Sequence, residues 1–419
     1  MMNKNSFVWM MLILIVGVTL GVYSTYFHQV RAFPEQRSAS VGTLECWVYT
    51  DTWGPLLDRF QTEHPEIGLH VRVFRSYTDL YEELMNAISA KTAPDVVELN
   101  NAYGLAELLG LTELLGQDVL APAQTYLTPE DEASIGETFR SAFMSGNSLW
   151  AAPAGVSLPI MFYNRDMVQR GGLEQSLGFP DLSSFTASVR TWLSGQPDES
   201  GLPGSLHALA VDRSFPFLFT SMWESRKPED RKARLQELLG EWRGLAVEPG
   251  VMKPLQHELA LSDFISGKTM FYAATSERRA WLQRYIGGKF DYGLLPLPET
   301  NGQTVLPQVT AFAVFSMNDR VKPAGELVRY LISPEVQSDH LGTTGYLPVR
   351  GELAGQPNGD SVLTGLYAPL WEKKSPGPSQ PGAYGLFRWK VLEEELQRLE
   401  FGTEQDVVRA ADKLLPLMP

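Results

Sequence analysis

The segment from residue 44 to residue 103 constrains the fold of this chain most strongly, because strand and helix patterns alternate in it. Leu44 to Tyr49, Leu69 to Phe74 and Asp95 to Leu99 read as strands, with helix patterns between them. Strands that alternate with helices pair in parallel through right-handed crossovers. Ligands bind beside the carboxyl ends of strands in such sheets, so we expect a binding crevice where the first and third strands end.

Polar and aromatic residues follow both of these strands. Asp51 and Trp53 follow the first, where a carboxylate would accept hydroxyl groups and an indole would cover a ring. The alternative is that Asp51 caps the next helix and Trp53 packs against it. Asn100, Asn101 and Tyr103 follow the third strand, and two amides in a loop need hydrogen-bond partners. We therefore expect these three residues to contact a ligand.

The N-terminus carries a long apolar segment. Phe7 to Phe27 contains no charged residue, and Lys4 precedes it. As a helix, this segment would span a hydrocarbon core of roughly 30 Å, and it is longer than a typical signal-peptide core. We expect residues 1–42 to form an uncleaved membrane anchor and linker that leave the body of the protein outside, with a cleaved signal peptide as the alternative.

Size and charge narrow the class of protein. The chain has 419 residues, of which 44% are hydrophobic. This length exceeds what a single hydrophobic core usually supports, so we expect two domains. The net charge of -14 is dispersed along the chain, which argues against nucleic acid as a partner. The single cysteine, Cys46, lies in the first strand and reads as a buried apolar residue. We expect a monomer.

Catalytic and metal-binding signatures are absent from the sequence. It contains no Gly-x-Ser-x-Gly elbow and no His-Glu-x-x-His helix, and its six histidines are scattered. Gly267-Lys268-Thr269 imitates the end of a phosphate loop, but Ser262 stands where the first glycine belongs. We expect a binding protein without metal or cofactor. A glycoside hydrolase is the enzyme alternative, because the spacing of paired carboxylates of about 5 to 10 Å is not visible in a sequence.

The rest of the chain continues the alternation of strands and helices. Pro153 stands between two short strand patterns, where we expect the chain to cross between two lobes. Thr128 to Asp131 is typical of a capped helix start. The strand patterns are Leu149 to Ala152, Leu158 to Tyr163, Thr269 to Ala274, Asp291 to Leu295 and Thr310 to Phe315. The helix patterns lie near Leu182 to Ser194, Pro228 to Arg243 and Leu255 to Ser266.

Several segments together resemble the maltose-binding type of extracellular solute-binding protein, the receptors of ABC importers. Their order and spacing cover nearly everything after residue 42. The segments that carry the resemblance are Phe60 to Ile67 (FQTEHPEI), Ala93 to Val97 (APDVV), Leu149 to Pro153 (LWAAP), Phe162 to Asp166 (FYNRD), Phe264 to Met270 (FISGKTM) and Gly345 to Arg350 (GYLPVR).

The resemblance implies a two-lobed α/β fold of the periplasmic-binding-protein type (type II), with a hinge between the lobes. It assigns residues 43–152 plus 298–333 to the first lobe and residues 153–297 plus 334–419 to the second. It further implies capture of a small ligand, with a carbohydrate as the expected class, for delivery to an ABC permease. Reporting to a membrane sensor kinase is the alternative output. The expected location is the bacterial cell surface, anchored to the plasma membrane or secreted.

Further binding candidates follow from the same resemblance. In sugar-binding members, the strand after Met270 commonly leads into a tryptophan that stacks on the ligand, whereas Ala274 to Glu277 here has none, and Ser276 is the candidate in that stretch. Phe215 and Phe217 read as core residues. The remaining ligand candidates are Trp223, Gln308, Thr310, Tyr384 and Trp389.

Overall fold

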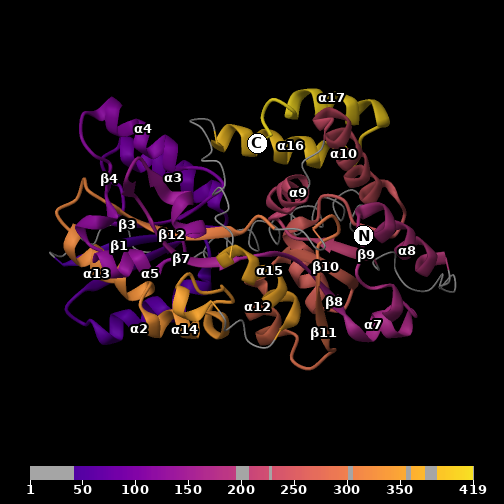
Figure 1. Cartoon of the computed structure of the whole chain (residues 1–419), viewed down its shortest axis with the longest axis horizontal. Coiled ribbons are helices and arrows are strands. Elements are labelled where there is room, and N and C mark those ends of the chain that lie inside the picture. Colours follow the sequence, from indigo (N-terminus) through magenta and orange to yellow (C-terminus); the bar gives the residue numbers. More distant parts are fainter. Residues whose placement is uncertain are drawn as a thin grey trace, which may run out of the picture. The chain divides into compact units, whose positions relative to one another are not determined.

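A computed structural model describes residues 42–194, 207–225, 229–300, 305–354, 360–372 and 385–418. The chain divides into two units, residues 1–43 and 44–419, and the described part of the second contains two large sheets, a two-stranded sheet and the helices packed on them (Figure 1). The expected anchor at Phe7 to Phe27 lies outside the described residues. None of the described helices combines the length and the apolar character needed to cross a bilayer.

The first sheet has six strands. Their order is β2-β1-β3-β12-β4, with β7 also paired to β12. β1 and β3 are parallel, as the alternation of strand and helix predicts, whereas β12 runs antiparallel to β3. The strands are β1 (Thr43–Val48), β2 (Gly68–Val73), β3 (Val96–Asn100), β4 (Leu120–Ala121), β7 (Ala152–Ser157) and β12 (Gln308–Phe315).

The second sheet has four strands in the order β11-β8-β10-β9. β10 is antiparallel to β8 and parallel to β9. The sequence patterns missed β9, because a short apolar run is not distinguished from a buried helix by periodicity. The strands are β8 (Pro159–Asn164), β9 (His207–Val211), β10 (Thr269–Thr275) and β11 (Tyr292–Pro296).

The chain passes from the first sheet to the second at Leu158, between β7 and β8, and not at Pro153. Pro153 lies inside β7 opposite Ala311, where the register of β12 shifts. A proline is tolerated at such an irregularity because one ladder hydrogen bond is missing there anyway. The strand therefore continues through Pro153 to Ser157.

Helices fill the connections, and local signals account for many of their ends. Thr128 and Asp131 form a capping box at α5, as its sequence predicts. A small hairpin, β5 (Met144–Ser145) and β6 (Ser148–Leu149), precedes β7. The helices from α2 to α9 are α2 (Gly54–Glu63), α3 (Tyr77–Ser89), α4 (Leu105–Leu115), α5 (Pro129–Ser134), α6 (Glu137–Arg140), α7 (Arg165–Arg170), α8 (Leu182–Ser194) and α9 (Phe215–Glu224).

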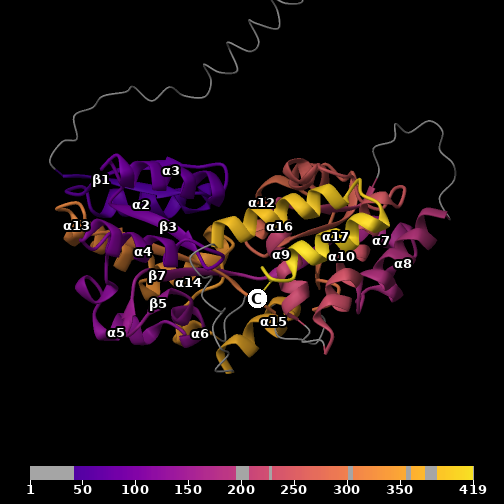
Figure 2. The same cartoon turned by 90° about the horizontal axis from the view of Figure 1, so that it is seen from above.

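The C-terminal third is mainly helical. α14 contacts α2 and α13 as well as α12, while α16 and α17 pack against α10, as both views show (Figures 1 and 2). The exact division into lobes at the residues given above stays a prediction. The later helices are α10 (Arg231–Val247), α11 (Ala260–Ile265), α12 (Arg278–Tyr285), α13 (Val321–Leu331), α14 (Pro334–Thr343), α15 (Ser361–Glu372), α16 (Gly385–Leu399) and α17 (Glu404–Leu414).

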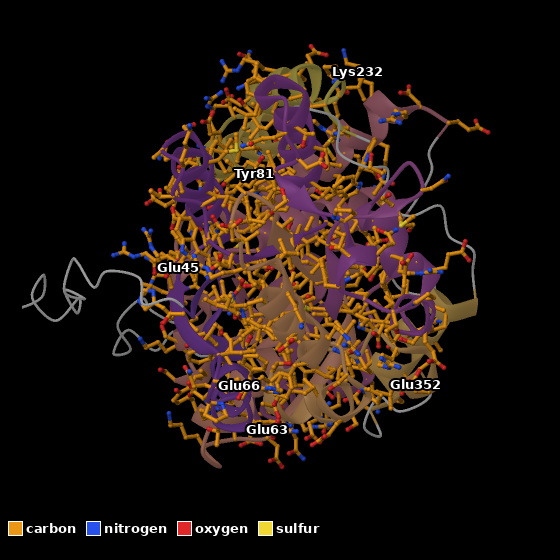
Figure 3. All side chains as sticks on the ribbon, turned by 90° about the vertical axis from the view of Figure 1, so that its left-hand side faces the viewer. Glu45, Glu63, Glu66, Tyr81, Lys232 and Glu352 are labelled. Carbon is orange, nitrogen blue, oxygen red and sulfur yellow. The ribbon has the colours of Figure 1, made fainter. Side chains whose placement is uncertain are left out.

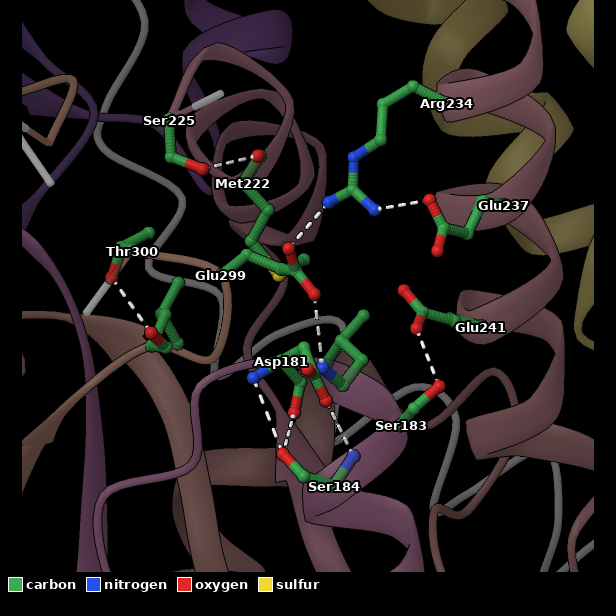
Figure 4. Close-up of polar contacts among 12 residues, drawn as sticks. Asp181, Ser183, Ser184, Met222, Ser225, Arg234, Glu237, Glu241, Glu299 and Thr300 are labelled. Atoms are coloured by element: carbon green, nitrogen blue, oxygen red, sulfur yellow. Dashed lines mark hydrogen bonds and ion pairs between the residues drawn. The ribbon is translucent and has the colours of Figure 1, made fainter. Parts of the chain in front are cut away.

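A buried ion pair holds the segment that follows β11. The Arg234 guanidinium of α10 lies 2.5 Å from the Glu299 carboxylate, whose other oxygen accepts the backbone N–H of Leu182 at 3.2 Å (Figure 4). Both side chains are buried. Glu299 also has a positive φ of 73°, an uncommon conformation for a residue with a side chain. The pair fixes this loop between α8 and α10.

Many acidic side chains lie at the surface. Glu45, Glu63 and Glu66 are visible on one side of the molecule, and Glu352 lies further round it (Figure 3). Glu63 is close to Arg59, at 3.0 Å, while the Glu66 side chain is 66% exposed. The dispersed negative charge is therefore mostly solvated.

Candidate functional site

The loops that follow β1 and β3 lie at the same edge of the first sheet. Cys46 pairs with Val96 and Trp47 with Val97, so both strands run toward that edge together. Thr50 caps the short turn that follows β1, since its hydroxyl accepts the backbone N–H of Thr52 at 3.3 Å. Asp51 is thus not the capping residue of this turn, and its side chain keeps contact with solvent although it is partly buried.

A buried carboxylate organises this edge. Glu98 on β3 accepts a hydrogen bond of 2.7 Å from the Trp53 indole Nε1 and one of 2.8 Å from the backbone N–H of Tyr49. Burial raises the pKa of Glu98 to about 8, although both hydrogen bonds favour the charged form. Glu98 was not among the residues predicted from the sequence, although a glutamate inside an otherwise apolar strand was a signal for it.

Trp53 lies beneath the surface of the edge. Its ring is fully buried, stacks on Tyr346 with centroids 5.2 Å apart, and meets Phe312 edge-on. These contacts correspond to the packing alternative for Trp53. A ligand contact by Trp53 stays a prediction.

Asn100 at the end of β3 and Asn101 directly after it both bond to other groups of the protein. Asn100 accepts the backbone N–H of Ala102 at 2.9 Å. The side chain of Asn101 donates to the Pro307 carbonyl at 3.0 Å and accepts the N–H of Val309 at 2.9 Å. Asn101 therefore joins the loop after β3 to the start of β12.

β12 brings two more candidates to the same edge. Thr310 pairs with Asn100 across the ladder and lies 3.3 Å from the Tyr49 hydroxyl. The Gln308 side chain accepts a hydrogen bond of 3.4 Å from Ser157 on β7. Gln308 and Thr310 thus lie beside the asparagine loop, and a ligand contact by either residue stays a prediction.

Ser276 is hydrogen-bonded to Leu158, where the chain crosses between the sheets. Its hydroxyl accepts the N–H of Leu158 at 3.0 Å, and its own N–H donates to the Leu158 carbonyl at 2.9 Å. Ser276 is fully buried. The structure therefore gives it a role in holding the crossing strand, and a ligand contact stays a prediction.

A second polar cluster joins the end of β9 to β10 and to the start of α12. The Asp212 carboxylate accepts hydrogen bonds from the Tyr272 hydroxyl at 2.5 Å and from the Arg278 guanidinium at 3.2 Å. Burial alone would raise the pKa of Asp212, but the Arg278 charge and the Tyr272 hydrogen bond outweigh it and lower the pKa. Glu277 lies beside this cluster and accepts the Thr275 hydroxyl at 2.6 Å.

A shallow hollow, partly open to solvent, lies between the turn after β1 and α12. It combines a carboxylate, an indole and a guanidinium, and Trp281 there stacks on Tyr285 with centroids 5.2 Å apart. Burial raises the pKa of Asp51, while the charges of Arg278 and Arg284 oppose the rise. The lining residues are Asp51, Thr52, Pro55, Ala280, Trp281, Arg284 and Thr343.

Trp281 was not predicted as a site residue, because the resemblance places a stacking tryptophan directly after β10 and Trp281 lies further along the chain. The helix α12 begins at Arg278, and Trp281 is on its first turn. Arg284 lies on the same side of α12, one turn further, since both residues line the hollow. Helical spacing from the end of the strand was the signal available.

Two aromatic candidates meet at another place along the edge. The rings of Tyr103 and Trp389 lie 5.9 Å apart, and the Tyr103 hydroxyl is 2.9 Å from that of Thr78. Lys390, next to Trp389, pairs with Glu82 of α3. α16 therefore connects the helices of the first sheet with α9 and α10.

Trp223 lies apart from these groups. It is buried within α9, and the Arg231 guanidinium lies 5.4 Å from its ring centroid. Phe215 and Phe217 are buried in the same core, as expected. Trp223 does not line the hollow, and Tyr384 lies outside the described residues. Among the described residues, no group of three His, Cys, Asp or Glu side chains could hold a metal ion.

The comparison with protein-family models gives a match over residues 56–360, to the bacterial extracellular solute-binding proteins. This chain belongs to that family. It is therefore an extracytoplasmic solute-binding protein and not an enzyme, and the family gives no support to the glycoside hydrolase alternative.

Curated relatives are more distant in sequence. Proteins named as binding proteins in Brucella abortus and Brucella suis are 25% identical over 174 residues, which are 40% of this chain and 40% of each relative. The matched part thus spans less than half of these relatives.

Solved structures of solute-binding proteins share the fold along nearly the whole chain. The GacH receptor of Streptomyces glaucescens, solved with acarbose, has a TM-score of 0.71 at 16% identity over 90% of this chain and 98% of that one. The maltotriose-binding protein of Thermus thermophilus has 0.69 at 14%, over 90% and 98%. UgpB of Mycobacterium tuberculosis, bound to glycerophosphocholine, has 0.67 at 16%, over 90% and 97%. The two-lobed α/β fold is therefore that of the maltose-binding type.

Proposed function

We propose that the protein captures a small carbohydrate or polyol between its two lobes and delivers it to an ABC-type importer. One observation carries this proposal: Asp51 from the first sheet faces Trp281 and Arg284 of α12 across one hollow. Carboxylates and guanidinium groups bind hydroxyls, and an indole covers the apolar face of a sugar ring. The ligands in GacH and in the Thermus protein support this class.

The energetics are compatible with a micromolar receptor, which needs about 8 kcal/mol. One indole that covers roughly 100 Å² of apolar sugar surface contributes about 2.5 kcal/mol at ~25 cal/mol/Å². Hydrogen bonds of about 1 kcal/mol each supply the remainder and offset the ordering cost. Several polar partners from both lobes are therefore required.

A ligand that is bound by both lobes would make their closure the change that reports binding. A ligand that contacts both lobes in the closed state stabilises that state and increases its population. We place the hinge at the crossing near Leu158 and at the start of β12, because the chain links the two sheets there. The division into lobes is part of this proposal, with the first boundary moved from residue 153 to Leu158, because β7 belongs to the first sheet.

The test is calorimetric titration of the full chain with maltotriose, D-mannitol and glycerophosphocholine, together with small-angle scattering. We expect a neutral sugar or polyol to bind and to make the protein more compact. Trp281→Ala should weaken that binding about tenfold or more, through the lost ring contact. Trp150→Ala is the matched control, because Trp150 is half-buried and does not line the hollow. Equal losses in both variants would contradict the proposed site.

The output of binding is tested in cells. Deletion of the gene should abolish uptake of the ligand if the protein feeds an ABC permease. Loss of a transcriptional response with uptake intact would instead assign the protein to a membrane sensor kinase. We propose that residues 1–42 tether the protein at the outer side of the plasma membrane, and membrane fractionation tests this, since a cleaved segment would release the body.

A further inference from the structure

The stretch between β10 and α12 places two buried polar groups side by side. Glu277 is 7% exposed, and its Oε2 has no hydrogen-bond partner among the described residues. The Nε of Arg278 is also buried, and it too is without a partner in the described part of the chain. Arg278 Nε and Glu277 Oε1 are 3.9 Å apart, which is too far for a hydrogen bond.

The surrounding contacts hold both groups in place. Thr275 donates to Glu277 Oε1 at 2.6 Å, and Arg278 Nη2 donates to Asp212 at 3.2 Å. The backbone of Gly345 packs closely against that of Glu277, because a Cβ added at Gly345 would lie 2.2 Å from the Glu277 carbonyl oxygen. Neither group is therefore free to turn toward bulk water without moving its neighbours.

The charges of this cluster determine what it accepts. Arg278 is balanced by Asp212, whose pKa is lowered by Arg278 and Tyr272 against the effect of burial. Glu277 is then a surplus carboxyl group, and burial raises its pKa. The carboxyl groups of Asp212 and Glu277 would repel an anionic ligand group. The Arg278 guanidinium would repel a cationic one. A neutral group avoids both penalties.

The cluster also faces the first lobe. Glu277 affects the ionisation of Glu98, Tyr49 and Tyr346, and Arg278 affects that of Asp51. Ala280, which lies two residues after Arg278 on α12, lines the hollow opposite Asp51. The pair is thus close to the hollow, at the start of the helix whose next turn lines it.

We propose that Glu277 and Arg278 form a subsite for the hydroxyl groups of a neutral sugar or polyol, and that they select such ligands over phosphate-bearing ones. A hydroxyl both donates and accepts, so one hydroxyl, or two on neighbouring carbons, satisfies Glu277 Oε2 and Arg278 Nε together. This inference rests on the proposed function and names the groups that recognise the ligand at that site.

The experiment is titration of the full chain with maltotriose, D-mannitol and glycerophosphocholine, before and after two conservative substitutions. Glu277→Gln keeps an acceptor for Thr275 but replaces the second oxygen with a donor. Arg278→Lys keeps the charge beside Asp212 but removes Nε. Each should weaken binding of the neutral ligand about tenfold to a hundredfold. Glu174→Gln is the control, because Glu174 is exposed on the same lobe.

The outcomes separate this inference from the proposed function. If the wild type binds maltotriose or D-mannitol and both variants bind equally well, the subsite is wrong while the proposed function stands. Preference of the wild type for glycerophosphocholine would overturn the selection of neutral ligands. A wild-type chain that binds none of the three probes contradicts the proposed function and the inference with it. Thermal unfolding of each variant shows whether a loss of binding is a loss of folding.

Discussion

The indole Nε1 of Trp53 donates a hydrogen bond of 2.7 Å to the Glu98 carboxylate, and this bond joins the loop after β1 to the strand β3. Glu98 has no exposed surface, so its second oxygen depends on the N–H of Tyr49. The carboxylate therefore holds the two chain segments at the edge where the candidate site begins. Several consequences for stability and pH dependence are measurable.

Glu98 makes the stability of the fold depend on pH. Its folded-state pKa of about 8 lies above the ordinary value of 4.5, so folding favours the protonated form. That contribution is fully present below about pH 4.5 and is lost as the pH rises through about 8. We expect the free energy of unfolding of the wild type, relative to Glu98→Gln, to fall across this interval. Urea titrations at several pH values measure it, and parallel curves for the two proteins would contradict the prediction.

Because Gly345 lies so close to Glu277, we expect a single added methyl group at Gly345 to lower the stability of the protein markedly. Gly345 has φ +80°, and an added Cβ would lie 2.2 Å from the Glu277 carbonyl. Gly345→Ala should lower the free energy of unfolding by about 2–5 kcal/mol, from left-handed strain and overpacking. Gly116→Ala is the control, since Gly116 has φ +67° with nothing within 4 Å of the added atom, and strain alone costs about 1–2 kcal/mol. Similar denaturation midpoints for the two variants would refute the contact.

His257 should stabilise the C-terminal helices in a pH-dependent way. Its Nε2 lies 2.8 Å from Glu400 and its Nδ1 lies 2.9 Å from the Val211 carbonyl. Burial alone would lower the pKa of His257, but the hydrogen bond and charge of Glu400 raise it above 6.5. The contribution is therefore present below pH 6.5 and lost as the pH rises through the folded-state value.

His257→Gln should accordingly destabilise the protein more at about pH 5.5 than at about pH 9, measured by chemical denaturation. His64→Gln serves as the control, because His64 is partly exposed at the end of α2. A destabilisation by His257→Gln that is equal at both pH values would show that the imidazole acts only through packing.

The buried pair of Arg234 and Glu299 should behave as a unit. Glu299→Ala removes the buried carboxylate beside Arg234 and leaves only the exposed Glu237 as its partner, and we expect a loss of up to about 3–5 kcal/mol. The double substitution Arg234→Ala/Glu299→Ala should cost less than the sum of the single ones in a thermodynamic cycle. Glu248→Ala is the control, because its partner Arg190 is 60% exposed and such pairs contribute about 0–1 kcal/mol. Additive single effects would argue against coupling.

Asn101 should matter for stability through its two backbone partners. Asn101→Ala removes the acceptor of the Val309 N–H and the donor to the Pro307 carbonyl, and we expect a loss of about 1–3 kcal/mol. Asn86→Ala, at an exposed position of α3, should change stability by less than about 0.7 kcal/mol. Thermal unfolding of both variants is the measurement. An unchanged midpoint for Asn101→Ala would mean that water replaces the amide without loss.

Local patterns were sufficient for most elements of the fold. The α8 boundaries Leu182–Ser194 and the capping box at Thr128 agree with the sequence, because helical periodicity and end signals act over a few residues. The crossing at Leu158 could not be predicted from such local patterns. Pro153 is a local breaker, but the register shift that accommodates it is on β12, which is remote in sequence.

The sequence by itself determined the strands, the edge at which their loops gather, and the family, since alternation and spacing are properties of the chain. Only the tertiary structure decided which polar groups are buried together. Glu98 bonds to Trp53 across 45 positions, and Asp51 shares a hollow with Trp281 and Arg284 of α12, which are remote in sequence. The strength of these contacts depends on burial and distance, and a sequence fixes neither until the sheets pack.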